Sequence, residues 1–218
     1  MSSDALSADQ VIWAYTQGLF PMGTPYTQTI QWHAPDPRGV IPLDTFHMPH
    51  NLARHVRRGT FRVSSDTAFP AVIAGCADRD ETWITPPIKE VYTELHERGV
   101  AHSVECWSDD ALAGGLYGVA LGGAFFGESM FFRKSYASKV ALAHLVRQMR
   151  GGGYQLLDTQ YTTKHLERFG AREVPRGRYL GILQRALAHD CPWWPLPNEP
   201  FDGLPDMNEA PDFGPAPS

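Results

Sequence analysis

Residues 112–132 read LAGGLYGVALGGAFFGESMFF and residues 154–160 read YQLLDTQ, and these two stretches decide the fold. Leu112–Leu121 and Ala124–Phe132 are apolar runs of strand character, and the two glycines between them are a strong hairpin signal. Tyr154–Asp158 is a short apolar run that is typical of a buried strand. The sequence therefore predicts three strands of one sheet, of which the first two are antiparallel.

A helix separates this hairpin from the third strand. Ala137–Arg150 has an apolar stripe at helical spacing, and three glycines end it. Ala101–Trp107 supplies a further strand before the hairpin. A meander followed by strand, helix and parallel strand predicts an α+β fold, in which helices flank a mixed sheet. This layout resembles the GNAT-type acyltransferase core, so we expect a GNAT-like mixed β-sheet core.

The flanking segments carry weaker signals. Ser7 and Gln10 form a capping-box pattern at the start of a helix over Ala8–Gln17. Phe20–Met22 is predicted to be a turn, and the proline-rich Trp32–Arg38 to be irregular. Four further helices are expected: His50–Arg58, Pro86–Arg98, Thr163–Phe169, and one that is capped by Asp66 and ends at Ala77. The remaining expected strands are Thr60–Ser64 and Arg178–Leu183.

These elements are expected to form three parts. Residues 1–62 are predicted to be a small N-terminal α/β subdomain, and residues 63–194 a GNAT-like transferase core. Residues 195–218 are rich in proline and acidic residues and lack apolar periodicity, which predicts a disordered acidic tail.

Composition and motif content exclude several functional classes. No run of 18 apolar residues occurs, which excludes a membrane-spanning helix, and residues 1–10 lack the features of a signal peptide. Three widely spaced cysteines favour a reducing compartment, so we expect a cytoplasmic protein. No HExxH, GxSxG, P-loop or Rossmann fingerprint occurs, and we expect neither a metal nor another cofactor.

The net charge of −5 hides an uneven distribution. Residues 199–218 contain five acidic residues and no lysine or arginine, so the rest of the chain carries 19 basic and 19 acidic residues. A neutral body can still present a basic face to a nucleic acid. Arg54, Arg57, Arg58 and Arg62 form a basic run without intervening acids. Such a run suits a phosphate backbone, and the alternative is a solvated helix face.

Asp158 and Gln160 are the sharpest candidates for chemistry. They follow a short buried run two residues apart, and side chains alternate along a strand, so both can point the same way. The carboxyl end of a parallel strand is where α/β sheets bind ligands. From spacing alone, the alternative is an Asx-type turn at Asp158 that caps the next helix.

Glu128 and the start of the following helix are further candidates. Glu128 interrupts an apolar strand, where a carboxylate is costly unless it is paired or hydrogen-bonded. It could receive a cationic ligand, and the alternatives are a barely exposed strand face or an internal ion pair. Tyr136–Lys139 begins a helix, whose free N–H groups suit a phosphate or an RNA 3′ end. Capping of that helix by Ser135 or Ser138 is the alternative.

Short motifs occur in a fixed order from about residue 14 to 183. They are AY at 14–15, GLFP at 18–21, Trp32 with PDPR at 35–38, CA at 76–77 with Arg79, TWIT at 82–85, LH at 95–96, AHSVE at 101–105 with Trp107, GGLYGV at 114–119, GESMF at 127–131, ASK at 137–139, Asp158 with Gln160, HL at 165–166, GA at 170–171 and PR at 175–176. Each piece is short, but the combination is highly specific. It resembles the leucyl/phenylalanyl-tRNA–protein transferase family.

The resemblance implies an aminoacyltransferase. Such an enzyme moves Leu or Phe, and weakly Met, from aminoacyl-tRNA to the α-amine of proteins with N-terminal Arg or Lys, which creates an N-degron. The partners implied are aminoacyl-tRNA and those proteins, with no membrane, and we expect a monomer. Because the donor ester is already activated, no ATP, metal or other cofactor is required.

The resemblance also implies roles for single residues. Asp158 and Gln160 form the catalytic pair, in which Gln160 hydrogen-bonds the attacking amine, and Asp158 orients Gln160 or acts as a base. Glu128 binds the N-terminal Arg or Lys of the acceptor. The other implied contacts are an apolar aminoacyl pocket of Leu116, Phe125, Met130, Leu142 and Leu145, a site for the terminal adenosine at Met22 and Trp83, and a tRNA backbone site at Arg54, Arg57, Arg58 and Lys139.

The chain departs from the family pattern in two places. Met22 stands where the family often has tryptophan, which weakens stacking on an adenine. The family's longer stretch with a Gly-Gly-Asp element has no counterpart before Ala14. Two alternatives stay open: a GNAT-type N-acyltransferase that uses acyl-CoA, although no Q/R-x-x-G-x-G/A loop precedes Ala137, and a non-catalytic RNA- or peptide-binding module.

Overall fold

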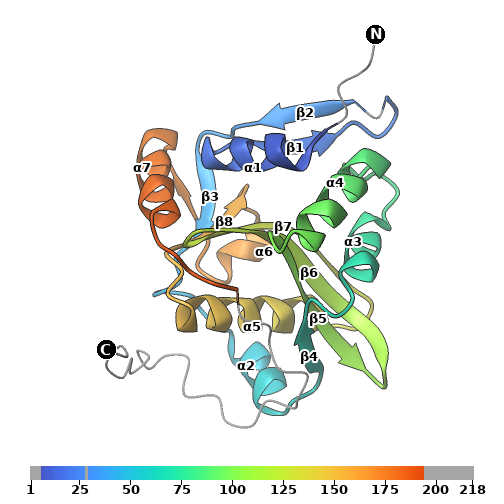
Figure 1. The fold of residues 1–218 in the computed structure, drawn as a ribbon. Helices are drawn as coiled ribbons and strands as arrows, with labels where there is room; N and C mark the ends of the chain where they lie inside the picture. The colour runs from blue at the N-terminus through green and yellow to red at the C-terminus, as the bar shows by residue number, and fades with distance from the viewer. Residues whose placement is uncertain (1–5, 28, 194–218) are drawn as a thin grey trace.

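The computed structural model describes residues 6–27 and 29–193. Its elements are α1 (Ala8–Thr16), β1 (Phe20–Gly23), β2 (Ile30–His33), β3 (Arg38–Ile41), α2 (His50–Arg57), β4 (Arg62–Ser65), α3 (Phe69–Ala77), α4 (Pro86–Glu97), β5 (Ala101–Ser108), β6 (Ala111–Leu121), β7 (Ala124–Phe132), α5 (Ala137–Gly151), β8 (Leu156–Gln160), α6 (Lys164–Glu167), β9 (Arg172–Val174) and α7 (Arg176–Leu187). A seven-stranded sheet with the order β4-β5-β6-β7-β8-β3-β9 forms the centre, and β1 and β2 pair separately (Figure 1).

The predicted meander and its parallel partner are confirmed. Strands β5, β6 and β7 are antiparallel, and Gly122, with φ of 53°, turns the chain between β6 and β7. Helix α5 then carries the chain back, so that β8 pairs parallel to β7. The fold is therefore α+β, with a large mixed sheet flanked by helices. No described helix combines the length and the apolar character that crossing a membrane requires.

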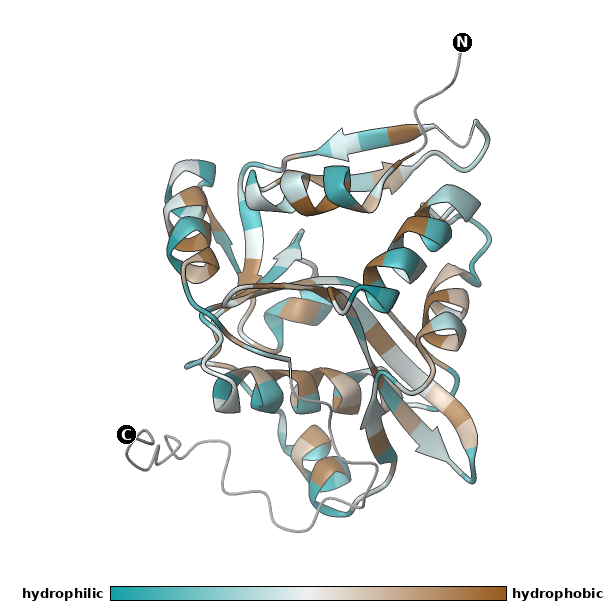
Figure 2. Cartoon of the chain, in the orientation of Figure 1, coloured by the Kyte–Doolittle hydropathy of each residue, from teal (hydrophilic) through white to brown (hydrophobic). Residues whose placement is uncertain are grey.

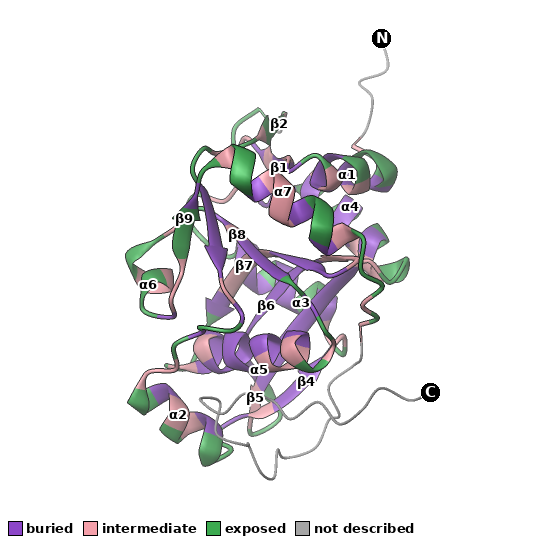
Figure 3. Cartoon of the chain, turned by 90° about the vertical axis from the view of Figure 1, so that its left-hand side faces the viewer, coloured by how far each residue is buried: buried purple, intermediate pink, exposed green. Residues whose placement is uncertain are grey.

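Each face of the sheet has its own apolar core. Helix α5 covers one face and α2 packs on α5, while α1, α3, α4 and α7 lie on the opposite side (Figure 1). Figure 2 shows apolar and polar residues alternating along α4 and α5, as expected for helices with one buried side. In Figure 3 the central strands are buried, whereas much of α2, α6 and β9 is exposed.

An opening in the sheet between β7 and β8 positions the site. The parallel ladder joins Ala124 to Leu156 and ends where Phe126 pairs with Asp158. Beyond that pair, β7 continues along β6 as far as Phe132, whereas β8 ends at Gln160 and pairs with β3 on its other side. The two neighbouring strands therefore part at Asp158.

Three local predictions are wrong. Phe20–Met22 is not a turn, because these residues belong to β1 and pair with β2. Arg178–Leu183 is not a strand but lies in α7, where Tyr179, Leu183 and Ala186 bury one face at helical spacing. An apolar run of this length does not distinguish strand from helix by itself.

Asp66 does not cap a helix, which is the third wrong prediction. Its carboxylate lies 2.8 Å from Nδ1 of His102 and accepts a hydrogen bond from the Ser103 amide, so it is turned toward β5. Helix α3 starts later, at Phe69. The predicted capping box of Ser7 and Gln10 is confirmed in both directions.

The expected division into parts stays a prediction. Strand β3 belongs by sequence to the expected N-terminal unit of residues 1–62, yet it hydrogen-bonds between β8 and β9 of the larger sheet. The expected acidic tail, residues 195–218, lies outside the described residues.

Gly18 supplies a test of how α1 is fixed to α7. Gly18 and Gly99 both follow a helix with positive φ, at 72° and 70°, but an added methyl group would lie 2.9 Å from the Tyr179 ring at Gly18 and would meet nothing at Gly99. Gly99→Ala is expected to lower the free energy of unfolding by about 1–2 kcal/mol through backbone strain alone. Gly18→Ala is expected to cost about 1–3 kcal/mol more, through overpacking. Equal shifts in urea denaturation midpoints would contradict this packing role.

Candidate active site

A cavity of about 220 Å³ lies where β7 and β8 part. Its apolar wall consists of Leu116, Met130, Leu142, Leu145, Leu157 and Leu166. Its polar wall includes Arg79, Glu128, Ser129, Thr159, Thr163 and His165. The lining therefore combines apolar side chains with a few hydrogen-bonding groups, as is usual for small-molecule sites.

Four of the five residues expected for the aminoacyl pocket line this cavity: Leu116, Met130, Leu142 and Leu145. Phe125 does not. It pairs with Leu157 inside the β7–β8 ladder, where the strands are still joined, and its ring stacks on Trp193 with centroids 5.4 Å apart. The ladder thus keeps Phe125 in the core. Leu157 and Leu166 complete the apolar wall, and sequence patterns did not single them out.

Asp158 is held by a buried arginine. Arg38 donates from Nε to Oδ1 and from Nη2 to Oδ2, each at 2.9 Å, and neither side chain is exposed. The Tyr179 hydroxyl donates to Oδ2 at 2.5 Å, and the Gln160 amide N–H donates to Oδ1 at 2.8 Å. Both carboxylate oxygens are therefore saturated with donors. The bond from the Gln160 N–H is the Asx-type turn that spacing offered as the alternative, but Asp158 does not cap the next helix, because Thr163 caps α6.

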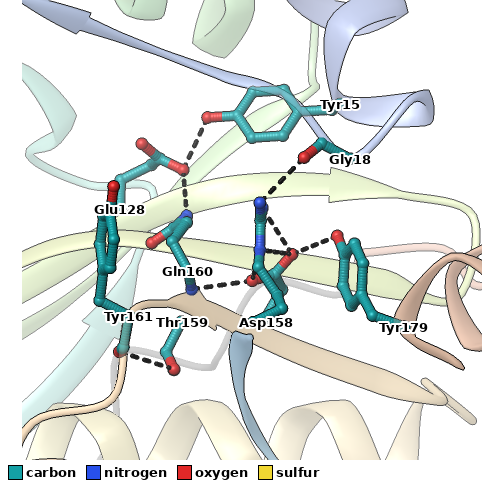
Figure 4. Close-up of polar contacts among 9 residues, drawn as sticks. Tyr15, Gly18, Glu128, Asp158, Thr159, Gln160, Tyr161 and Tyr179 are labelled. Carbon is teal, nitrogen blue, oxygen red and sulfur yellow. Dashed lines mark hydrogen bonds and ion pairs between the residues drawn. The ribbon is translucent and has the colours of Figure 1, made fainter. Parts of the chain in front are cut away.

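Gln160 connects Asp158 to Glu128 (Figure 4). Its backbone has φ of 57°, a left-handed conformation that is uncommon outside glycine. Its amide N–H is bound to Asp158, and its side-chain Nε2 donates to Glu128 Oε1 at 2.8 Å. The contact between Asp158 and Gln160 therefore runs through the backbone, while the side chain of Gln160 extends toward the cavity wall at Glu128.

Glu128 lies in a hydrogen-bonded group, and no lysine or arginine among residues 6–27 and 29–193 forms an ion pair with it. The Tyr15 hydroxyl donates to Oε1 at 2.6 Å and the Tyr92 hydroxyl to Oε2 at 3.1 Å, so the alternative of an internal ion pair is wrong. The two hydroxyls also lie 2.5 Å apart. Burial raises the pKa of Glu128 to about 7, although the hydrogen bonds from both tyrosines lower it. Glu128 therefore changes its charge near neutral pH.

The residues expected to contact RNA are not part of the lining of this cavity. Met22 on β1 is next to Trp83, because the adjacent Gly23 amide donates to the Trp83 carbonyl at 3.0 Å. Arg54, Arg57 and Arg58 are exposed at the end of α2. The ammonium group of Lys139 lies 4.7 Å from the ring centroid of Tyr136. No side chain caps α5, so capping by Ser135 or Ser138 is not observed.

Sequence reasoning missed four residues that hold this site: Tyr15, Arg38, Tyr92 and Tyr179. Tyr15, Tyr92 and Tyr179 are buried members of the apolar faces of α1, α4 and α7, so their pattern predicts packing and not a polar role. Arg38 ends a proline-rich segment, and no periodicity in the neighbouring residues predicts that its side chain is buried. The available signal was Glu128 itself, since a carboxylate in an apolar strand requires donors from elsewhere in the chain.

Comparison with known proteins gives the family. The chain matches the leucyl/phenylalanyl-tRNA protein transferase family over residues 40–184 and the N-terminal domain of that family over residues 4–36. The leucyl/phenylalanyl-tRNA–protein transferase of Salinibacter ruber is 64% identical over 193 residues, which cover 88% of this chain and 85% of that protein. The transferase of Akkermansia muciniphila is 53% identical, with 85% and 98% covered.

A solved structure titled as that of L-PGS from Bacillus licheniformis aligns with a TM-score of 0.39 and 13% identity, over 73% of this chain and 55% of that one. A likeness this low carries no argument, so the GNAT-like core stays a prediction. The family match and the two relatives establish family membership without it: the chain belongs to the leucyl/phenylalanyl-tRNA–protein transferase family.

Proposed function

We propose that this enzyme transfers Leu or Phe, and weakly Met, from aminoacyl-tRNA to the α-amine of proteins that begin with Arg or Lys, and thereby creates an N-degron. The observation that carries the proposal is the cavity between β7 and β8, whose lining combines apolar side chains with the carboxylate of Glu128. An apolar side chain and a cationic one thus find different surfaces in one site.

The apolar wall suits the donor amino acid. A volume of about 220 Å³ is below that of pockets for drug-sized ligands, roughly 300–1,000 Å³, and is appropriate for one amino-acid side chain. Leucine side chains and Met130 form this wall, so selection rests on size and shape. Such walls discriminate poorly between side chains that differ by a methylene. Leu, Phe and Met all have apolar side chains, so an apolar wall is compatible with each of them.

The hydrogen bonds of Asp158 favour an orienting role over a basic one. To accept a proton, Asp158 would have to give up part of its contact with Arg38, which would leave a buried cation without its partner. Asp158 is instead suited to fix the backbone of Gln160 and hence the direction of its side chain. The Gln160 amide can then hold the acceptor's α-amine beside the ester.

The reaction needs positioning more than activation. The amine nitrogen bonds to the ester carbonyl carbon, the bond from that carbon to the 3′ ribose oxygen breaks, and one proton passes from the nitrogen to the ribose oxygen. The α-amine has a pKa near 8, so a reactive neutral fraction exists at neutral pH. Holding amine and ester together supplies much of the rate.

Glu128 suits the cationic side chain of the acceptor. Its carboxylate is held by hydrogen bonds from Tyr15, Tyr92 and Gln160 and lines the cavity. An arginine or lysine side chain that approaches it favours the ionised form and pairs with it. An uncharged side chain leaves this carboxylate uncompensated, which provides a basis for acceptor selectivity.

The finer structural expectations are supported unequally. The GNAT-like core that we propose is supported by the order of the meander β5–β7, α5 and the parallel β8. The cytoplasmic location, the monomeric state and the division at residue 62 stay predictions.

The direct test is a transfer assay. Phe-tRNA or Leu-tRNA is supplied with peptides that are identical except for their first residue, which is Arg, Lys, Asp or Ala. Transfer to the Arg and Lys peptides alone is expected, with acetyl-CoA inactive as donor. Transfer that does not depend on the first residue would contradict the acceptor assignment.

Gln160→Ala is expected to lower kcat about 100-fold, because the amine loses the group that holds it against the ester. Thermal unfolding should change little, since this side chain makes one described hydrogen bond. Asp158→Asn is expected to lower kcat as well, but also to destabilise the protein by about 3–5 kcal/mol by leaving Arg38 unpaired. Wild-type transfer in both variants would refute the catalytic assignment.

Glu128→Gln is expected to change how stability depends on pH. Folding raises the pKa of Glu128 from an ordinary 4.5 to about 7, so folding favours its protonated form. The contribution of Glu128 to stability is therefore complete below pH 4.5 and is lost as the pH rises through 7. The loss is about 2–5 kcal/mol. In urea denaturation, the free energy of unfolding of Glu128→Gln should rise relative to that of wild type as the pH increases from 5 to 8. The exposed control Glu90→Gln should show no such relative increase. A difference that is constant with pH would count against the raised pKa.

A further inference from the structure

A second cavity borders the first one. It has a volume of about 370 Å³ and lies between the start of α2, the start of α5 and α6. Its lining includes His50, Asn51, Tyr136, Lys139, His165 and Arg168, and we call it the cationic cavity. His165 lines both cavities, so the two are direct neighbours.

We propose that the cationic cavity binds the phosphodiester group that precedes the terminal nucleoside of the donor RNA. This inference rests on the proposed function, because it takes the first cavity as the site of the aminoacyl group. It goes beyond that function by assigning a distinct binding site, with Arg168, His50 and His165 as new members beside Lys139.

The charges of the cationic cavity favour an anion. Its lining contains a lysine, an arginine and two histidines and no acidic residue. Within residues 6–27 and 29–193, neither Lys139 nor Arg168 takes part in an ion pair, whereas Arg98 and Lys134 on other surfaces do. Two cationic side chains without acidic partners beside one cavity provide a binding site for a phosphate.

The electrostatic field reaches the wall shared by the two cavities. Burial lowers the pKa of His165, and the nearby charges of Lys139 and Arg168 lower it further. The first turn of α5 adds the positive end of a 15-residue helix, with Tyr136 and Lys139 of that turn in the lining and no side chain that caps it. Helix N-termini favour anions for the same electrostatic reason.

The covalent structure of the donor requires a phosphate near this place. The terminal ribose carries the acyl group on its 3′ oxygen, the adenine on C1′ and the phosphodiester on its 5′ oxygen. When the acyl group occupies the first cavity, the phosphodiester lies one sugar away. The cationic cavity adjoins the first one at His165 and has no other proposed occupant, whereas Met22 and Trp83 are assigned to the adenine.

The position of the cationic cavity also suits the path of an RNA strand. Helices α2 and α6 lie toward one side of the molecule, below the β1–β2 hairpin, in the view of Figure 3. A strand that contacts Arg54, Arg57 and Arg58 at α2 would therefore pass α6 before its last base reaches β1. The arginines of α2 are exposed, whereas the cationic cavity is hollowed and can fix one phosphate in place.

The test compares donors with and without the phosphodiester. Three donors are used: phenylalanyl-adenosine, which has no phosphate, the phenylalanyl ester of the dinucleotide CpA, which has one phosphodiester, and Phe-tRNA. The variants are Arg168→Gln and, as matched control, Lys164→Gln, which removes an exposed cation of α6 outside both cavities. Each is assayed with an Arg-starting peptide.

In wild type, the dinucleotide donor is expected to have a higher kcat/KM than phenylalanyl-adenosine. Arg168→Gln is expected to lower kcat/KM about tenfold for the dinucleotide donor, the worth of one charge-assisted contact, and to leave phenylalanyl-adenosine unchanged. Lys164→Gln should leave both unchanged. For Phe-tRNA, Arg168→Gln should also reduce the slope of log affinity against log salt by about 0.7, the value for one phosphate on a single strand.

Two results would overturn the proposal. In one, wild type uses the dinucleotide no better than phenylalanyl-adenosine. In the other, Arg168→Gln lowers transfer from both small donors equally, which means that Arg168 supports the acyl site and not a phosphate. Activity with phenylalanyl-adenosine also reports that each variant is folded. Failure of all donors in wild type would instead refute the proposed function, so the two failures are distinguishable.

Discussion

The buried ion pair between Arg38 and Asp158 is the interaction on which the rest of the site depends. Two charges without exposure to water are costly unless every donor and acceptor is used. Here Arg38 contacts both carboxylate oxygens and the Gly18 carbonyl, and its guanidinium lies 4.9 Å from the ring centroids of both Phe20 and Tyr179. One side chain thus joins β3 and β8 to the end of α1, to β1 and to α7.

This arrangement gives the two carboxylates of the site different properties. Asp158 is enclosed by donors that leave it no freedom, whereas Glu128 is hydrogen-bonded to hydroxyl and amide groups and titrates near neutral pH. Pairs of carboxylates in contrasting environments are a usual way to divide roles within an active site. Gln160 contacts both, through its backbone on one side and its side chain on the other.

Sequence patterns predicted the parts of the fold that are local. The meander β5–β7 and helix α5 follow from apolar periodicity and from glycines at their ends, and the family resemblance followed from motif order. Helix α7 was mistaken for a strand, because a short apolar run fits both periods. Strand β1 was missed because its assignment depends on pairing with β2.

The candidate site was predictable in its residues but not in its geometry. Asp158, Gln160 and Glu128 were noticeable as polar groups in apolar strands. That Arg38 is the partner of Asp158 was not, since the two are 120 positions apart and nothing local marks an arginine as buried. The exclusion of Phe125 from the cavity was equally hidden, because it depends on where the β7–β8 ladder stops.

The parting of β7 and β8 determines what kind of pocket this enzyme has. The cavity begins at the pair Phe126–Asp158, where the hydrogen bonds between the two backbones stop. The main chain therefore leaves the space open, and the side chains line it. Arg79, which lines the cavity, donates a hydrogen bond of 2.7 Å to the main-chain carbonyl of Met130. Replacing one leucine of the lining by another apolar residue therefore changes how well a bound side chain fits, while the separation of β7 and β8 stays the same.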